Sequence, residues 1–159
     1  LEHVRHMYEV RAVIEGLAFR KAAENMAAHL ENKAAEEPAH KATDKIAEKG
    51  AALLRAGRKA AESRSVASLI AADMAFHHFI YELAGNPLIG SAMETHWTHS
   101  QRVMGEVLTR DEKPRDIWDQ HEALLQAVMQ PQPALAEKLA RRHITEAADF
   151  MIQRLKPSP

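Results

Sequence analysis

Four ionisable side chains lie on helical stripes that are otherwise apolar, where they could act together. Asp73 and His77 are one helical turn apart, so their side chains share one face of a predicted helix. His121 and His143 fall in register with the apolar positions of two later helices. An ionised carboxylate buried without a partner is very costly. A divalent metal would satisfy this carboxylate and the imidazoles together, and such donors suit zinc first, with nickel, manganese or iron as alternatives.

A plainer interpretation of the same residues stays open. A histidine on an apolar helix face is more often a hydrogen-bonded core residue than a metal ligand, and Asp73 and His77 could bond to each other. Spacing alone does not decide between a metal site and a polar core whose groups satisfy one another.

A second group of polar residues could bind an anion. Arg11 falls on the apolar face of the first predicted helix, and Arg102 lies one position off the apolar stripe of the fourth. A guanidinium binds a carboxylate or phosphate in a forked geometry. An internal salt bridge or an exposed side chain explains either arginine equally well. His96 and His99 lack an accompanying carboxylate, so they are predicted to line a pocket rather than to bind metal.

A bundle of helices is expected to position these residues. The chain holds only 6 glycines and 7 prolines in 159 residues, and its apolar residues recur at helical spacing, which favours an all-α fold. Short connections favour antiparallel neighbours. Ser63 and Ser65 are candidate caps for the third helix, and Gly85-Asn86-Pro87 should end it. The expected helices cover about residues 2–33, 39–61, 66–84, 88–108, 115–129 and 134–155.

The apolar stripes predict which face of each helix is buried. The first helix should bury Val10, and the second, with a thin apolar stripe, should lie on the outside. The fourth helix should bury Met93, His96, Ser100, Val103 and Val107. The sixth should bury Leu135, Leu139, His143, Ala147 and Phe150.

The overall composition excludes several classes of protein. The length suits one domain, and a net charge of −1 lacks the basic excess of a domain that binds nucleic acid by itself. No uncharged stretch is long enough to span a membrane. The absence of cysteine excludes disulfides, thiolate metal sites and a cysteine nucleophile, and it fits a cytoplasmic protein.

Several short motifs stand in order along the chain and carry a resemblance to a known family. They are Tyr8-Glu9-Val10-Arg11 followed by Glu15, Asp73-Met74-Ala75-Phe76-His77, Gly85-Asn86-Pro87, His121 near a helix start, and Arg142-His143-Ile144. Together they resemble the FCD domain, the effector-binding domain of the FadR-type branch of GntR transcription regulators. The resemblance spans residues 8–152, although residues 34–61 align poorly.

The resemblance implies a fold and a set of ligands. The fold would be an antiparallel bundle of six or seven helices, and the metal would keep open positions for a small effector, usually an organic acid. Arg11 and Arg102 would be candidates for the effector's carboxylate. His96 and His99 fall outside the family pattern and could tune effector choice or add a ligand. The implied metal ligands are Asp73, His77, His121 and His143.

The resemblance also implies partners. Family members are typically homodimers and carry a winged helix-turn-helix domain, which we expect upstream of Leu1. DNA would be bound only through that domain, and no membrane is involved. Residues 1–155 would form the ligand-sensing domain and residues 156–159 a frayed tail.

Two other functions compete with ligand sensing. A metal-dependent hydrolase or oxygenase is compatible with the ligand set, because an open metal position can activate water. However, no general base lies on a matching stripe, and the paired Glu-x-x-His motifs of di-iron bundles are absent. A purely structural bundle would bind neither metal nor effector. The sequence does not name the effector, and acids resembling lactate, gluconate, citrate or an aromatic acid all stay open.

Overall fold

The computed structural model describes residues 1–33, 37–110 and 116–156. Within these ranges every regular element is an α-helix, which confirms the predicted all-α bundle. The predicted turn at 111–114 and residues 157–159 of the predicted tail lie outside the described residues. The observed helices are α1 (Glu2–Lys33), α2 (Glu37–Ser63), α3 (Val66–Ala84), α4 (Pro87–Arg110), α5 (Trp118–Met129) and α6 (Pro133–Leu155).

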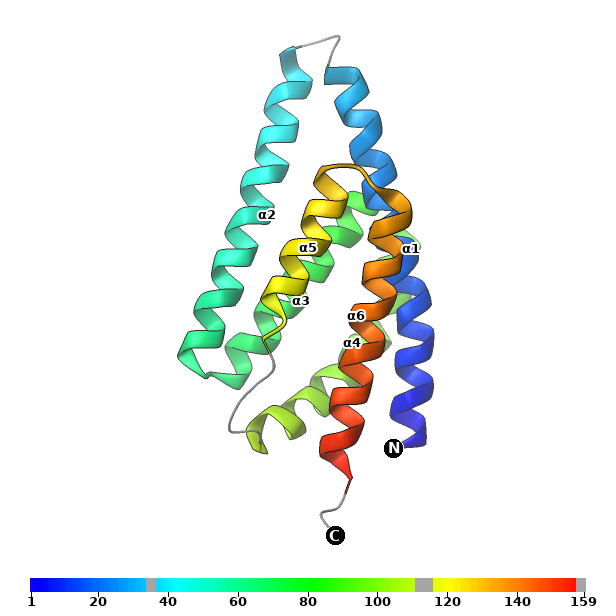
Figure 1. The fold of residues 1–159 in the computed structure, drawn as a ribbon, viewed down its shortest axis with the longest axis vertical. Helices are drawn as coiled ribbons and strands as arrows, with labels where there is room; N and C mark the ends of the chain where they lie inside the picture. The colour runs from blue at the N-terminus through cyan, green and yellow to red at the C-terminus, as the bar shows by residue number, and fades with distance from the viewer. Residues whose placement is uncertain (34–36, 111–115, 157–159) are drawn as a thin grey trace.

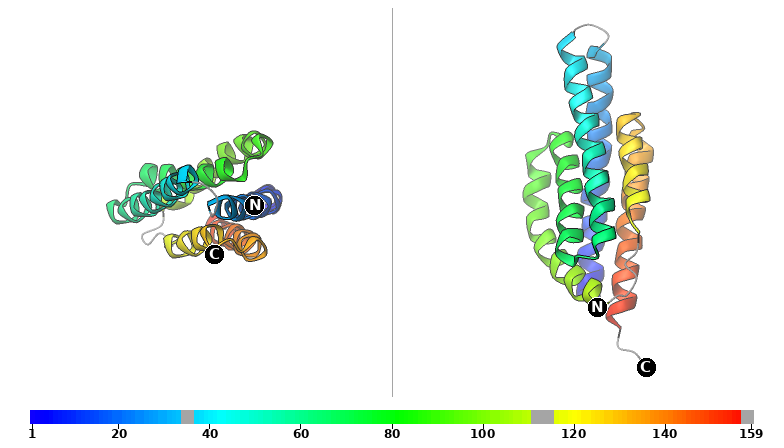
Figure 2. Two further views of the ribbon diagram at one scale, coloured as in Figure 1. Left: turned by 90° about the horizontal axis from the view of Figure 1, so that it is seen from above. Right: turned by 90° about the vertical axis from the view of Figure 1, so that its left-hand side faces the viewer.

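Helix α1 lies at the centre of the bundle and contacts each of the other described helices. Seen from above, α2, α3 and α4 form one layer, and α5 and α6 form another on the opposite side of α1 (Figure 2). Successive helices run in opposite directions (Figure 1), as the short connections predicted. Because of its central place, α1 brings its buried side chains to both layers.

The ends of α3 follow from local sequence. The Ser65 hydroxyl accepts a hydrogen bond from the backbone N–H of Ser68 at 3.3 Å, which confirms one of the two predicted caps. Ser63 instead donates to the carbonyl of Ala60 at 2.8 Å. At the other end, Gly85 adopts a left-handed conformation with φ of 69°. Glycine tolerates this conformation without strain, so the helix ends where the sequence predicted.

The buried face of α6 differs from the predicted stripe. Leu135 is 39% exposed, whereas Ala136 and Ala140 are fully buried; of the predicted positions only His143 is classed as buried. Helix α6 packs most extensively against α1, and small side chains allow the close approach. A methyl group added at Gly16 of α1 would lie 2.9 Å from the side chain of Arg141. Close packing therefore favours the small side chains of Ala136 and Ala140 in the first half of α6, whereas Ile144, Met151 and Ile152 are buried in its second half.

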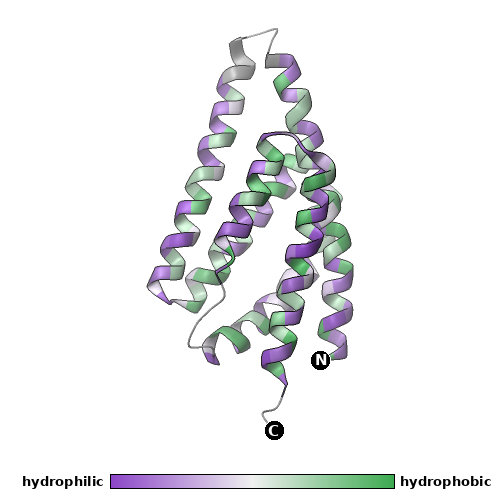
Figure 3. Cartoon of the chain, in the orientation of Figure 1, coloured by the Kyte–Doolittle hydropathy of each residue, from purple (hydrophilic) through white to green (hydrophobic). Residues whose placement is uncertain are grey.

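Two further expectations about buried faces were wrong. In α1, Val10 is 50% exposed, although it was predicted to be buried. Arg11 is buried, as its place on the apolar face predicted, and Glu15 is buried with it. In α4, Trp97 is buried, whereas His96 is only half-buried. The indole N–H of Trp97 donates a hydrogen bond to the buried Tyr81 hydroxyl of α3. This bond lowers the free-energy cost of burying the polar N–H group with the large ring. The hydropathy colouring shows such mixed polar and apolar positions along the helices (Figure 3).

A glycine in α2 provides a test of this packing. The Trp118 ring of α5 fills the place where a side chain at Gly57 would lie. We expect Gly57→Ala to destabilise the protein by about 1–3 kcal/mol, because the bulky ring has to shift. Gly105→Ala is the control, since nothing lies within 4 Å of an added methyl group there. Alanine at this helical position should stabilise by up to about 1 kcal/mol. Urea unfolding measures the free energy of unfolding of both variants. Equal changes in the two variants would contradict the close packing of Trp118 on Gly57.

Candidate metal centre and its cavity

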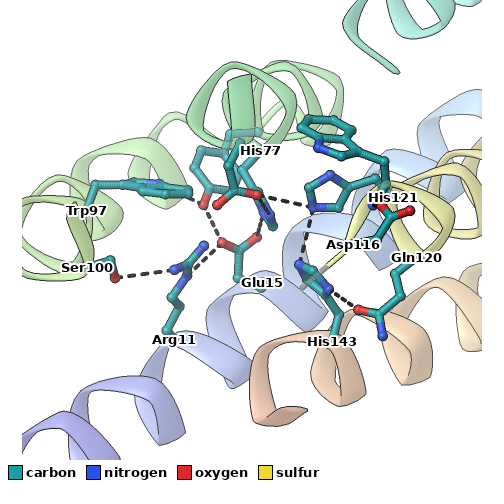
Figure 4. Close-up of polar contacts among 12 residues, drawn as sticks. Arg11, Glu15, His77, Trp97, Ser100, Asp116, Gln120, His121 and His143 are labelled. Atoms are coloured by element: carbon teal, nitrogen blue, oxygen red, sulfur yellow. Dashed lines mark hydrogen bonds and ion pairs between the residues drawn. The ribbon is translucent and has the colours of Figure 1, made fainter. Parts of the chain in front are cut away.

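The four predicted ligands come together between α3, α5 and α6. Asp73 and His77 lie one turn apart on α3, and His121 and His143 come from the two helices of the opposite layer. One donor atom from each residue lies within 4.8 Å of the other three, and all four residues are buried. The close-up view shows the imidazoles of His77, His121 and His143 gathered beside α1 (Figure 4).

The inward atoms of this cluster face one another, and the Nε2 atoms of His121 and His143 share a hydrogen bond. His121 Nε2 lies 3.2 Å from Asp73 Oδ1 and 3.3 Å from His143 Nε2. His77 Nε2 lies 3.6 Å from the same Asp73 oxygen. Neither Asp73 Oδ1 nor His77 Nε2 has a well-directed hydrogen bond, although both atoms are buried. Buried polar atoms normally have a partner. These two unsatisfied atoms converge with Nε2 of His121 and of His143, and the set fits a divalent cation with nitrogen and oxygen ligands.

The outward atoms of two imidazoles are held by oxygen acceptors. His77 Nδ1 donates to Glu15 Oε2 at 2.9 Å, and His143 Nδ1 donates to Gln120 Oε1 at 2.7 Å. The Gln120 amide in turn donates to Glu146 at 2.8 Å, which fixes its orientation. An outward N–H leaves Nε2 directed into the cluster, where it can bind a metal once it carries no proton.

His121 is held by aromatic packing instead. Its ring stacks on Phe76 at 4.4 Å between centroids and meets Trp118 edge to face at 4.5 Å. Its Nδ1 atom is buried without a hydrogen-bond partner in the described structure. Hydrogen-bond acceptors therefore orient the imidazoles of His77 and His143, whereas neighbouring aromatic rings orient that of His121.

Glu15 connects the cluster to α1 and α4. Besides His77, it accepts hydrogen bonds from the Tyr81 hydroxyl at 2.6 Å and from Arg11 Nε at 3.2 Å. Trp97 donates to the same Tyr81 oxygen at 3.1 Å. Arg11 Nη1 donates to the Ser100 hydroxyl at 3.2 Å (Figure 4). Glu15 thus supports a candidate ligand and a buried arginine at once.

Sequence reasoning did not predict this role of Glu15 or the support from Gln120. Glu15 was noted only as part of a motif. Its signal was its place one turn after Arg11 on the buried face of α1, the spacing of an intrahelical ion pair. Gln120 offered no such signal, because its acceptor role depends on how α5 and α6 pack together.

The electrostatic surroundings separate the protonation states of the histidines. Burial opposes ionisation of His77, but Glu15 and then Asp73 overcome it and raise the pKa of His77 to about 9. Burial likewise opposes ionisation of Glu15, yet His77 and Arg11 lower its pKa to about 2. Burial lowers the pKa of His121 and of His143. At neutral pH, His121 and His143 are therefore neutral, the form that binds metal.

A cavity of about 70 Å³ opens beside the cluster. Its polar lining includes Tyr8, Arg11, Asp73 and His143, and the rest of the wall is mainly apolar. The cavity brings Arg11 next to candidate ligands from α3 and α6, as an anion-binding arginine would require.

The other predicted effector residues do not line this cavity. Arg102 is exposed on α4. His96 and His99 are half-buried, and the ring of His99 packs against His3 at 5.7 Å. The Nδ1 atom of His96 is buried without a hydrogen bond.

The family model of the FCD domain matches residues 25–146 of this chain. The chain belongs to the FCD domain family. FCD domains are the C-terminal effector-binding domains of GntR-family transcription regulators. The matched range contains all four residues of the buried cluster, whereas Arg11 and Glu15 precede it.

The other comparisons add no relative to this FCD domain. No curated protein and no solved structure matches the chain. Among the described helices of the FCD domain, none is long and apolar enough to cross a membrane.

Proposed function

We propose that this FCD domain senses a small organic acid beside a divalent metal and thereby controls a DNA-binding domain of the same regulator. The observation that carries the proposal is the set of buried, converging donors of Asp73, His77, His121 and His143 next to a cavity that Arg11 lines. Zinc is the first candidate metal, and nickel, manganese or iron are alternatives.

Each part of the chain has a distinct task in this proposal. Asp73 and the three histidines hold the metal, while Glu15 and Gln120 orient His77 and His143. When bound, a divalent cation supplies positive charge that attracts a carboxylate. Arg11 lies on the cavity wall and adds a second positive group there.

The acid would control the regulator by favouring one arrangement of the bundle. The cavity is lined by residues from α1, α3, α4 and α6, so a ligand in it contacts helices of both layers. A ligand shifts such an equilibrium only through different affinities for the two arrangements. In a homodimer this shift would change the spacing of two winged helix-turn-helix domains on an operator. In this proposal the protein is a regulator that acts in the cytoplasm.

The geometry gives less support to a metal-dependent hydrolase or oxygenase. Among the described residues that line the cavity, the carboxylate is that of Asp73, which is assigned to the metal. Glu15 already accepts hydrogen bonds from Arg11, His77 and Tyr81. It is therefore poorly placed to serve as a general base.

Elemental analysis of protein purified without chelator or nickel resin tests the metal part of the proposal. We expect about one divalent metal per chain. Melting curves with and without small organic acids then test sensing, and acid should stabilise the metal-loaded protein more than the chelator-treated protein. Absence of metal, even after addition of zinc, manganese or nickel, would contradict the proposal. So would an acid that binds the full-length regulator yet leaves its operator affinity unchanged.

Metal binding should also release a proton from His77. Its raised pKa of about 9 means that the metal-free protein holds His77 protonated at pH 7.5, and ligation needs the Nε2 lone pair. We expect release of about one proton per metal at pH 7.5, falling toward zero as the pH rises above 9. Calorimetric titration in buffers of different ionisation enthalpy measures this release. A value of zero at pH 7.5 would contradict the assigned charge of His77.

A further inference from the structure

The cavity beside the cluster has two chemically different ends. Arg11 and Asp73 are its charged lining groups, and Tyr8 and His143 add polar atoms. Arg11 bonds to Ser100 of α4, and Leu108 lies eight residues, about 12 Å, farther along this helix, so the cavity extends from the charged groups toward Leu108. The remainder of the wall comes from helices α3, α4, α5 and α6 and from Ile117, which precedes α5. That part of the wall is aliphatic, thioether and aromatic: Leu69, Met104, Leu108, Ile117, Trp118, Ile144, Ala147, Phe150 and Met151.

The net charge at the polar end, with a divalent cation bound, can be neutralised by one negative charge on the ligand. Arg11 is already paired with Glu15 at 3.2 Å, and Asp73 adds a second carboxylate. With neutral imidazoles, these side chains together carry one net negative charge, and a divalent cation turns it into one net positive charge. A single carboxylate neutralises that charge. A second carboxylate would lie against the apolar wall without a partner, which is strongly unfavourable.

The apolar wall also disfavours hydroxyl groups on the ligand. Helical backbone groups beside the cavity bond within their own helices, and the side chains of Leu108, Ile144 and Phe150 have no hydrogen-bonding atoms. The hydroxyl of Tyr8 belongs to the polar part of the lining beside Arg11. A ligand hydroxyl that leaves water for the apolar part of the wall loses its hydrogen bonds and gains none there. The volume of about 70 Å³ is enough for several ordered waters, each of which needs about 10–15 Å³ by this measure. A ligand with only a few carbon atoms therefore suits the space.

We propose that this domain selects monocarboxylic acids with a short apolar body over hydroxylated acids and acids with two or more carboxylates. The carboxylate lies at the end of Arg11 and the buried cluster, and the hydrocarbon body contacts the wall around Leu108 and Phe150. The selection rests on the proposed function of the site as a metal-assisted acid sensor. It narrows the range of effectors from several classes of organic acid to one.

Three acids with the same four-carbon chain test this selection by calorimetric titration of the zinc-loaded protein at pH 7. They are butanoate, succinate with a second carboxylate, and 2,3,4-trihydroxybutanoate with added hydroxyls. We expect butanoate to bind about tenfold more tightly or better than either of the others, the change expected for one unpaired polar group. Tighter binding of succinate or of the trihydroxy acid would overturn the selection while leaving the sensor intact.

A variant of the wall separates selection from mere binding. Leu108→Lys places a positive charge at the apolar end, so it should strengthen succinate binding and weaken butanoate binding. Leu88→Lys is the matched control, because Leu88 lies on the same helix, is 72% exposed and does not line the cavity. If the ratio of butanoate affinity to succinate affinity is unchanged in Leu108→Lys, Leu108 does not belong to the apolar end of the cavity. Failure of all three acids to bind zinc-loaded protein would overturn acid sensing and the selection together, and failure to load zinc, manganese and nickel would refute the proposed function itself.

Discussion

Asp73→Ala and His121→Ala should each abolish the metal content of the purified protein. Each variant removes one of four converging ligands. Asp73→Ala removes the anionic ligand, and His121→Ala removes one of the three imidazoles. Losing a group that only orients a ligand typically costs 10–100-fold in metal affinity, so losing a ligand should cost more than about 100-fold. Elemental analysis and titration with zinc against a competing chelator measure the effect.

Two further variants keep this test independent of folding. Asp73→Asn retains the shape of the side chain but lacks its charge, and it should lose most of the affinity while keeping the helical spectrum. His78→Ala removes the adjacent histidine, which is exposed and outside the cluster, and it should retain full metal content. Metal bound equally by wild type, Asp73→Asn and His121→Ala would show that the ion lies elsewhere on the chain.

Glu15→Ala should destabilise the metal-free protein by about 3–5 kcal/mol, the usual cost of removing one partner from a buried ion pair. Glu15 is fully buried and accepts hydrogen bonds from Arg11, His77 and Tyr81. Its loss leaves the buried guanidinium of Arg11 without its paired carboxylate, and the Ser100 hydroxyl to which Arg11 donates carries no charge. Urea unfolding measures the change in the free energy of unfolding.

The control for this prediction is a partly exposed ion pair of the same chemistry. Glu137 is 23% exposed and pairs with Arg20 and Arg141, so Glu137→Ala should cost no more than about 1 kcal/mol. The double variant Arg11→Met/Glu15→Leu removes both charges and should be less destabilised than Glu15→Ala. If Glu15→Ala costs no more than Glu137→Ala, Glu15 is not the anchor of this cluster.

The Glu15 variants also report on the proposed metal site. Because Glu15 holds the outward nitrogen of His77, its loss should lower zinc affinity by about 10–100-fold. This is a smaller loss than that expected for Asp73→Ala. The order of the two effects therefore distinguishes a residue that orients a ligand from a ligand itself.

The sequence by itself determined the secondary structure and the candidate ligands. Helix ends depend on local chemistry, such as the cap at Ser65 and the left-handed Gly85, so they were predictable without knowledge of packing. Polar residues on apolar stripes stand out for the same reason: Asp73, His77, His121 and His143 each interrupt a local pattern. The structure brings together the same four residues.

The tertiary structure decided which faces meet and what supports the cluster. The sequence stripe of α6 pointed to its leucines, but close packing on α1 buried Ala136 and Ala140 instead. Whether Arg102 or Arg11 reaches the cavity depended in the same way on how α1 and α4 are turned in the bundle.

The supporting contacts of the site belong wholly to the tertiary structure. The bond from His77 to Glu15 joins residues on α3 and α1, and that from His143 to Gln120 joins α6 and α5. Such contacts leave no periodic signal, because they depend on the distance and rotation between helices. Local residue chemistry thus identified the candidate ligands, whereas the packing of the helices determined their orientation, their charges and the cavity beside them.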